Sequence, residues 1–326
     1  MKFLKSLVTV ASVLSIAALH GAAHAQAFPS KPVTFVVPYP AGGPIDAVAR
    51  AMGQKLSERW KQTVIVDNRP GGSEVIASQL VRGAAPDGHT ILVAGDPSLS
   101  INQFTFKKLA YDPVNDFTPV TRLVTFNMAL VVPATMPVGN MKEFVAHAKS
   151  KPGTLSFGSS GQGGPVHFSY TDLVSTTGID MTFVPYTGLA PIIQDLLGGR
   201  IDATFGALSV LHPHITSGKL KALAVGGKTR SKLLPDVPTF DELGYKGIDA
   251  SFYIGLAVPS KTPSDVVTKI ANDVREVITT PEFISKNIDL FALEVSVDGP
   301  SGFSEFLVAN RKHQAQRVKL SGFQVN

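Results

Sequence analysis

The residues best suited to chemistry form a glycine-rich loop at 38–46, with the sequence Pro-Tyr-Pro-Ala-Gly-Gly-Pro-Ile-Asp. The apolar run at 33–37 before this loop predicts a buried strand, and the amphipathic run at 45–60 predicts a helix. The tripeptide Gly42-Gly43-Pro44 suits the junction, because glycine bends freely and proline is tolerated at a first helical position. The loop should therefore present backbone amides at a helix N-terminus, where an anion is attracted.

A second loop at 160–165 repeats this arrangement between a predicted strand at 155–159 and a predicted helix at 166–177. Its glycines again precede a proline at a helix start, so a second set of amides is expected there. Neither loop matches a nucleotide-binding motif, because both lack the Gly-Lys-Ser/Thr ending and the G-x-G-x-x-G spacing. The segment 158–162 also falls short of the nucleophile elbow G-x-S-x-G, because position 162 is Gln.

Several titratable side chains lie beside these loops. His167, at the start of the second helix, either orients the second loop, contacts the polar end of a ligand or packs as a half-buried histidine. We expect Asp46 to accept amides of its own loop, since a carboxylate would repel a bound anion. Tyr39 and Tyr186 lie at strand ends, where a ring packs either at the mouth of a cleft or against the sheet edge.

No HExxH motif occurs, and the pair within His212-Pro213-His214 has no further His or Cys at ligand spacing, so we predict no metal, cofactor or catalytic residue.

Composition limits the class of protein. Residues 1–25 carry Lys2 and Lys5, an apolar run at 7–19 and the sequence Ala23-His24-Ala25, which predicts a secretory signal peptide cleaved after Ala25, with a membrane anchor as the alternative. The chain has no Cys, which excludes a disulfide framework. Its formal net charge of +5 is spread without any Lys/Arg-rich run, so nucleic-acid binding has little support.

Strands and helices alternate along the chain, which predicts an α/β fold with mostly parallel sheets flanked by helices. Loops at the carboxyl ends of parallel strands share one edge, so 95–98 is expected to line the same pocket as 38–46. Ser73 is predicted to cap the helix between these strands. A long extended run at 117–133 predicts a crossing into a second domain, and 251–258 predicts the return.

The mature chain, about 300 residues, exceeds what one core usually holds. We therefore predict a discontinuous first domain, 26–125 and 248–326, and a second domain, 126–247. Two crossings between such domains suit hinge closure over a cleft.

Motifs along nearly all of the mature chain resemble the Bug (TctC-like) family, the periplasmic substrate-binding proteins of tripartite tricarboxylate transporters. The resemblance rests on the segments 38–46 with Ala49-Arg50, 66–72 (VDNRPGG), 85–88 (APDG), 184–188 (VPYTG), 195–199 (DLLGG), 213–215 with 218–220, and 234–240 (LPDVPTF).

The resemblance implies a two-domain periplasmic-binding-protein-like fold, a Venus flytrap, that closes on a di- or tricarboxylate, an amino acid or an aromatic acid. It also implies a periplasmic location, delivery to a permease with large and small membrane subunits, no enzymatic activity, and a monomer. The ligand-binding residues that we predict from the loops and the family motifs together are Tyr39, Ala41, Gly42, Gly43, Ile45, Asp46, Ser98, Ser159, Ser160, Gly163, His167, Tyr186, Thr187 and Ala207.

Two positions depart from the family pattern. Ile45 stands where Thr or Ser is common, and Gly206-Ala207 stands where Asp-Asn is common. The missing carboxylate argues against an amino-acid ligand, because a buried ammonium needs a charged partner. Two alternatives remain open: a secreted hydrolase or transferase that uses Ser159 or Ser160 with His167, and a binding protein that presents its ligand to a histidine kinase.

Overall fold

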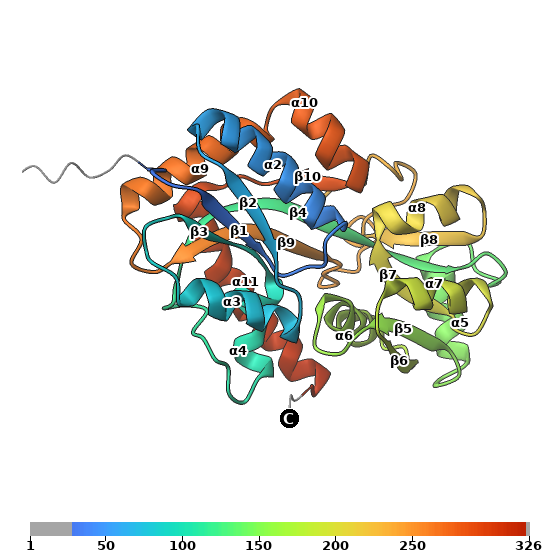
Figure 1. Cartoon of the computed structure of the whole chain (residues 1–326). Helices are drawn as coiled ribbons and strands as arrows, with labels where there is room; N and C mark the ends of the chain where they lie inside the picture. The colour runs from blue at the N-terminus through green and yellow to red at the C-terminus, as the bar shows by residue number, and fades with distance from the viewer. Residues whose placement is uncertain (1–27, 324–326) are drawn as a thin grey trace, which may run out of the picture.

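The structure is a computed structural model that describes residues 28–323 (Figure 1). The predicted signal peptide lies outside these residues. The strands are β1 Val33–Val37, β2 Val64–Asn68, β3 Thr90–Gly95, β4 Phe117–Pro133, β5 Ser156–Ser160, β6 Thr182–Tyr186, β7 Ala203–Ala207, β8 Leu220–Val225, β9 Ser251–Pro259 and β10 Leu293–Val295. The α-helices are α2 Pro44–Trp60, α3 Val75–Arg82, α4 Asn102–Thr105, α5 Met141–Ser150, α6 Pro165–Thr177, α7 Leu189–Leu197, α8 Leu208–Thr216, α9 Ser264–Ile278, α10 Pro281–Phe283 and α11 Gly299–Ser321. Short 3₁₀ or π turns are η1 Gly72–Glu74, η2 Pro97–Ile101, η3 Ile284–Ile288 and η4 Asp289–Phe291.

The first half of the fold is built on β1, which pairs in parallel with β2 on one side and β3 on the other. All its residues except Thr34 are buried, so both faces of this strand contribute to the core. Helix α2 follows with Pro44 at its first position and ends at Trp60, after which Lys61 adopts a left-handed conformation. The strand, loop and helix predicted around 38–46 are therefore present.

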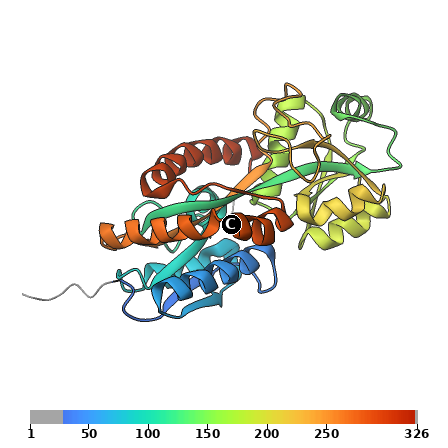
Figure 2. The same ribbon diagram turned by 90° about the horizontal axis from the view of Figure 1, so that it is seen from above.

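The 17-residue strand β4 connects the two halves of the molecule (Figure 2). It pairs with β9 up to the register Asn127 opposite Ser251, and from Met128 onward it pairs with β7. One continuous strand thus belongs to the sheets of both domains.

The second half repeats the order of the first: β5 pairs in parallel with β6 and β7, as β1 does with β2 and β3. The remaining pairings, β3–β9, β9–β4, β4–β10, β4–β7 and β4–β8, are antiparallel. The sheets are therefore mixed, and our expectation of mostly parallel sheets holds only for the three opening strands of each half. The physical reason is that β4 leaves the first domain while β9 returns to it, so the two strands run in opposite directions.

Each sheet is covered on both faces by apolar clusters. In the first domain one cluster gathers around Phe35 and Met52, and another around Leu92 and Phe303. The second domain likewise has one cluster around Phe157 on one face and another on the opposite face. Among the described helices, none is long and apolar enough to cross a lipid bilayer.

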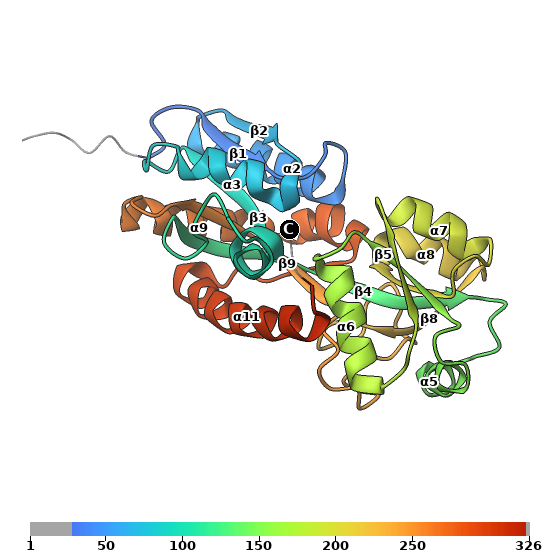
Figure 3. The same ribbon diagram turned by 90° about the horizontal axis from the view of Figure 1, so that it is seen from below.

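Helix α11 forms a further link between the domains. Its first half packs on the first domain through Phe303 and Leu307, and its second half lies beside α6 of the second domain (Figure 3). There Arg317, only 2% exposed, forms an ion pair of 2.9 Å with Asp172. Burial raises the pKa of the Asp172 carboxyl to about 7, against the opposing effect of Arg317.

We expect Arg317→Met to lower the free energy of unfolding by about 3 kcal/mol, because the buried carboxylate of Asp172 loses its charged partner. Urea denaturation measures this. Arg82→Met is the matched control, since Arg82 is exposed and its pair with Asp116 should contribute about 1 kcal/mol or less. Equal effects of the two substitutions would contradict the structural role of Arg317.

Candidate functional site

The two parallel triplets place the predicted site residues at two corresponding positions. In the strand order β2-β1-β3, the chain leaves β1 toward β2 on one side and then returns past β1 to β3 on the other side. The strands β6-β5-β7 are connected in the same way. Ligands of such sheets bind outside the carboxyl ends of the strands at this switch point. Tyr39 and the loop at 40–46 follow β1, and Ser98 follows β3. In the second domain, Ser159 and Ser160 end β5 and Ala207 ends β7.

Asp46 holds the first loop in place. Its carboxylate, 3% exposed, accepts the Gly42 amide at 2.8 Å, the Asn68 Nδ2 group at 2.9 Å and the Arg50 guanidinium at 2.9 Å. Burial alone would raise the pKa of Asp46, but the hydrogen bonds from Arg50, Gly42 and Asn68 outweigh it and lower the pKa. Asn68 also donates to the Tyr39 carbonyl at 3.0 Å, so the loop is fixed at both ends.

The rest of the first loop offers backbone rather than side chains. The Ile45 side chain is 8% exposed and belongs to the core of the first domain. Ala41 and Gly42 are exposed, and Gly43 is the N-cap of α2, where no side chain caps the helix. The first amides of a helix have no partner within it, so those after Gly43 remain as donors.

A carboxylate that the sequence analysis missed, Glu74, lies between the ends of β1 and β3. It is 4% exposed and accepts the Tyr39 hydroxyl on one oxygen. The other oxygen accepts the Gly95 amide at 3.1 Å and the Ser98 amide at 3.2 Å. Burial raises the pKa of Glu74, and burial followed by the charge of Glu74 raises the pKa of Tyr39.

The backbone that carries Glu74 is unusual. Residues 71–74 all have positive φ, including the two non-glycine residues Ser73 (φ 52°) and Glu74 (φ 71°). Such a conformation costs roughly 1–2 kcal/mol per residue outside glycine. Ser73 caps no helix, so that prediction is wrong, because α3 begins only at Val75 after the left-handed turn. The run of small residues before an isolated acidic residue was the signal that could have pointed to Glu74.

His167 holds the second loop. Its Nδ1 accepts the Gly163 amide at 3.0 Å, and its ring packs against Phe183 and Phe323. Burial lowers the pKa of His167 to about 4. The imidazole is therefore neutral near pH 7 and acts on the loop as a hydrogen-bond acceptor.

Internal hydrogen bonds also occupy the serine and tyrosine at this site. Ser159 Oγ donates to the Gly161 carbonyl at 2.9 Å, and the Gly161 amide donates to the carbonyls of Ser159 and Tyr186. The Tyr186 hydroxyl donates to Asp195 at 2.7 Å. Ser159 and His167 thus have other partners than each other, and no nucleophile–base pair forms here within residues 28–323.

The remaining predicted residues, Ser160, Thr187 and Ala207, are half-buried or exposed around the end of the second sheet. Their hydroxyl and amide groups stay predicted ligand contacts. In the part of the chain that the structure describes, no three His, Cys, Asp or Glu side chains gather as a metal site.

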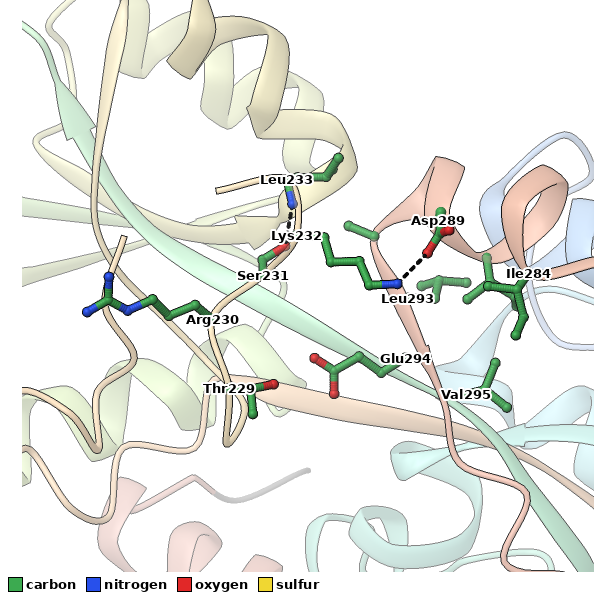
Figure 4. Close-up of a pocket in the computed structure, with 12 residues that line it drawn as sticks. Thr229, Arg230, Ser231, Lys232, Leu233, Ile284, Asp289, Leu293, Glu294 and Val295 are labelled. Carbon is green, nitrogen blue, oxygen red and sulfur yellow. Dashed lines mark hydrogen bonds and ion pairs between the residues drawn. The ribbon is translucent and has the colours of Figure 1, made fainter. Parts of the chain in front are cut away.

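Among the cavities of the described residues, two bear on the choice of site. One of about 370 Å³ lies between 229–233 and 284–295, where Lys232 approaches Asp289 at 3.5 Å (Figure 4). Another, of about 260 Å³, lies beside β9 and α11. None of the predicted ligand residues lines either cavity, although Asp96, which follows β3 directly, lines the second. We therefore place the candidate site at the strand ends.

Comparison with known proteins agrees with this architecture. The model of the tripartite tricarboxylate transporter family receptor matches residues 48–316. The chain belongs to this receptor family. The receptor is similar to the periplasmic binding protein BugD, with 31% identity, a TM-score of 0.76, and coverage of 92% of this chain and 100% of that chain.

Two further solved structures carry a bound acid. A protein from R. palustris with adipate is 29% identical, with a TM-score of 0.80 and coverage of 91% of this chain and 100% of that one. MatC from Rhodopseudomonas palustris with bound malate is 29% identical, with a TM-score of 0.74 and coverage of 89% of this chain and 100% of that one. The two-domain fold predicted from the sequence is confirmed by these likenesses.

We expect His167 of this receptor to stay neutral with an unprotonated Nδ1 from pH 8 down to about pH 5. Because its folded pKa lies below the unfolded value, stability is retained above about pH 6.5 and is lost as the pH falls toward 4. Nitrogen NMR of the imidazole during a pH titration measures this, with His167→Phe identifying the signal. Titration of His167 near pH 6.5 would contradict the buried, accepting ring.

Proposed function

We propose that the protein binds a small organic carboxylate between its two domains and delivers it to a membrane permease. One observation carries the proposal: glycine-rich loops lead into α2 and α6 at corresponding strand ends, each with proline at the first helical position. Each helix N-terminus contributes about 0.3–1 kcal/mol to an anion and up to about 2 when partly buried. The adipate and malate complexes of related proteins support an organic acid as the ligand class.

The loops are held before any ligand arrives. Asp46 fixes the first loop and His167 fixes the second, so their donors need little ordering on binding. We propose Ser160, Thr187 and the amides that follow Gly43 as ligand contacts, since these groups are not fully buried. The Tyr39 hydroxyl and the Ser98 amide already donate to Glu74, and Ser98 is fully buried. Closure of the domains would exclude water and strengthen the same hydrogen bonds.

A panel of organic acids tested by calorimetry, with small-angle scattering of the saturated protein, examines this function. We expect at least one acid to bind and to reduce the radius of gyration, because the domains close around it. Binding of none of the acids, or saturation without compaction, would count against the clamp.

Two substitutions sharpen this test. Gly43 and Gly164 have negative φ, and a Cβ at either position meets at most the Pro40 carbonyl at 3.6 Å, so Gly43→Leu and Gly164→Leu should fold. Each side chain would occupy the space in front of a helix N-terminus and weaken binding by about tenfold or more. Gly83→Leu, at the far end of α3, is the matched control and should bind as the wild type does.

We also propose export to the periplasm, cleavage after Ala25, and a monomer that docks on a permease with large and small membrane subunits. The apolar run at 7–19 with its two preceding lysines supports export. Cell fractionation and N-terminal sequencing should give a periplasmic protein that begins at Gln26. Retention in the inner membrane would favour the anchor instead. An adjacent histidine-kinase gene in place of permease genes would favour the sensory alternative.

A further inference from the structure

The Glu74 carboxylate is held entirely by the first domain. The Tyr39 hydroxyl and the amides of Gly95 and Ser98 donate to it, which places one donor at the end of β1 and two at the end of β3. A carboxylate that receives two backbone amides and a hydroxyl has the hydrogen bonding that a bound organic acid would need. Here a side chain of the protein takes these bonds.

These donors lie at the switch point between β1 and β3, where the ligand of such a sheet is expected. A Cβ on Gly95 would come within 2.5 Å of the Tyr39 hydroxyl oxygen and 2.7 Å of a Glu74 oxygen, so the site has no room for another group beside the two side chains. A ligand carboxylate cannot share these donors with Glu74.

A second buried carboxylate strengthens the negative character of this edge. Asp96, 2% exposed, follows β3 directly and accepts the Asn310 Nδ2 group at 2.6 Å and the Tyr253 amide at 3.2 Å. The hydrogen-bond partners of Glu74 and Asp96 in the described residues are neutral groups. Burial raises the pKa of Asp96 to about 7, so this carboxyl carries only part of a negative charge near pH 7. A second ligand carboxylate at this edge would therefore meet the charge of Glu74 and a partial charge on Asp96.

We propose that Glu74 is a built-in anion that occupies the acid-binding donors of the first domain and restricts the receptor to ligands with one carboxylate. The single carboxylate is held by the N-termini of α2 and α6, and the part of the ligand that faces β1 and β3 is neutral or cationic. This inference rests on the proposed function and specifies its ligand class. The absence of a carboxylate at Gly206-Ala207 argued against an amino-acid ligand, whose ammonium group needs a charged partner. Glu74 supplies a carboxylate in the opposite domain, so that argument no longer holds.

Adding acetate to a variant that lacks the Glu74 carboxylate tests whether the three donors of Tyr39, Gly95 and Ser98 can bind an acid. Glu74→Gly suits the left-handed backbone, so the variant should fold and leave the three donors open. We expect acetate, compared with chloride at equal ionic strength, to raise the Tm of Glu74→Gly by about 2 °C or more beyond its effect on the wild type. Glu74→Gln, which keeps the space filled, is the matched control and should respond as the wild type does. An equal acetate response in all three proteins would overturn the proposal.

The ligand class is tested with two sets of acids. Within each set the carbon skeleton is shared and the group at the far end differs. Adipate, hexanoate and 6-aminohexanoate form one set, and terephthalate, benzoate and 4-aminobenzoate form another. In calorimetry we expect the wild type to favour a one-carboxylate member over its dicarboxylate by roughly tenfold or more. Glu74→Gly should reverse or remove that preference, because its freed donors accept the second carboxylate.

The outcomes separate the two claims. Wild-type preference for the dicarboxylates, or a selectivity unchanged by Glu74→Gly, overturns the role of Glu74 and leaves carboxylate binding standing. Failure of the wild type and the variant to bind any of the six acids counts against the proposed function, and the inference falls with it.

Discussion

The pairing of β4 with strands of both domains is the constraint on which the rest of the molecule depends. Its hydrogen bonds to β9 end at Asn127, and those to β7 start at the next residue. Through this shared strand, the sheet that carries β1 and β3 is continuous with the sheet that carries β5 and β7. The second crossing, β9, runs antiparallel beside it, and α11 adds the buried Arg317–Asp172 ion pair.

In each domain, a polar side chain forms hydrogen bonds that hold that domain's own glycine-rich loop. Asp46 holds the Gly42 amide, and His167 holds the Gly163 amide, so a side chain at the third helical position reaches back to the preceding glycine loop in both cases. One partner is an ionised carboxylate and the other a neutral imidazole, but the geometry is equivalent. Loops held in this way keep their remaining donors aimed outward at little entropic cost on binding.

The two domains differ at the strand ends although their strand orders correspond. The first places Glu74 among the donors of β1 and β3, whereas the second ends β7 in the small residues Gly206 and Ala207. Gly206 and Ala207 alone argue against an amino-acid ligand, whereas Glu74 supplies a carboxylate in the first domain. Ligand charge in a two-domain receptor thus depends on both faces together.

Features that depend on local spacing could be predicted from the amino-acid sequence. Periodicity and the Gly-Pro junctions predicted β1, α2, β5 and α6, and the interaction of Asp46 with its own loop follows from residues four apart. The mixed sheets, the absence of a cap at Ser73 and the contacts of Glu74 with Tyr39, Gly95 and Ser98 became visible in the folded chain. The reason is physical: these contacts join segments far apart in the chain, and they exist only once strand order has brought the ends of β1 and β3 together.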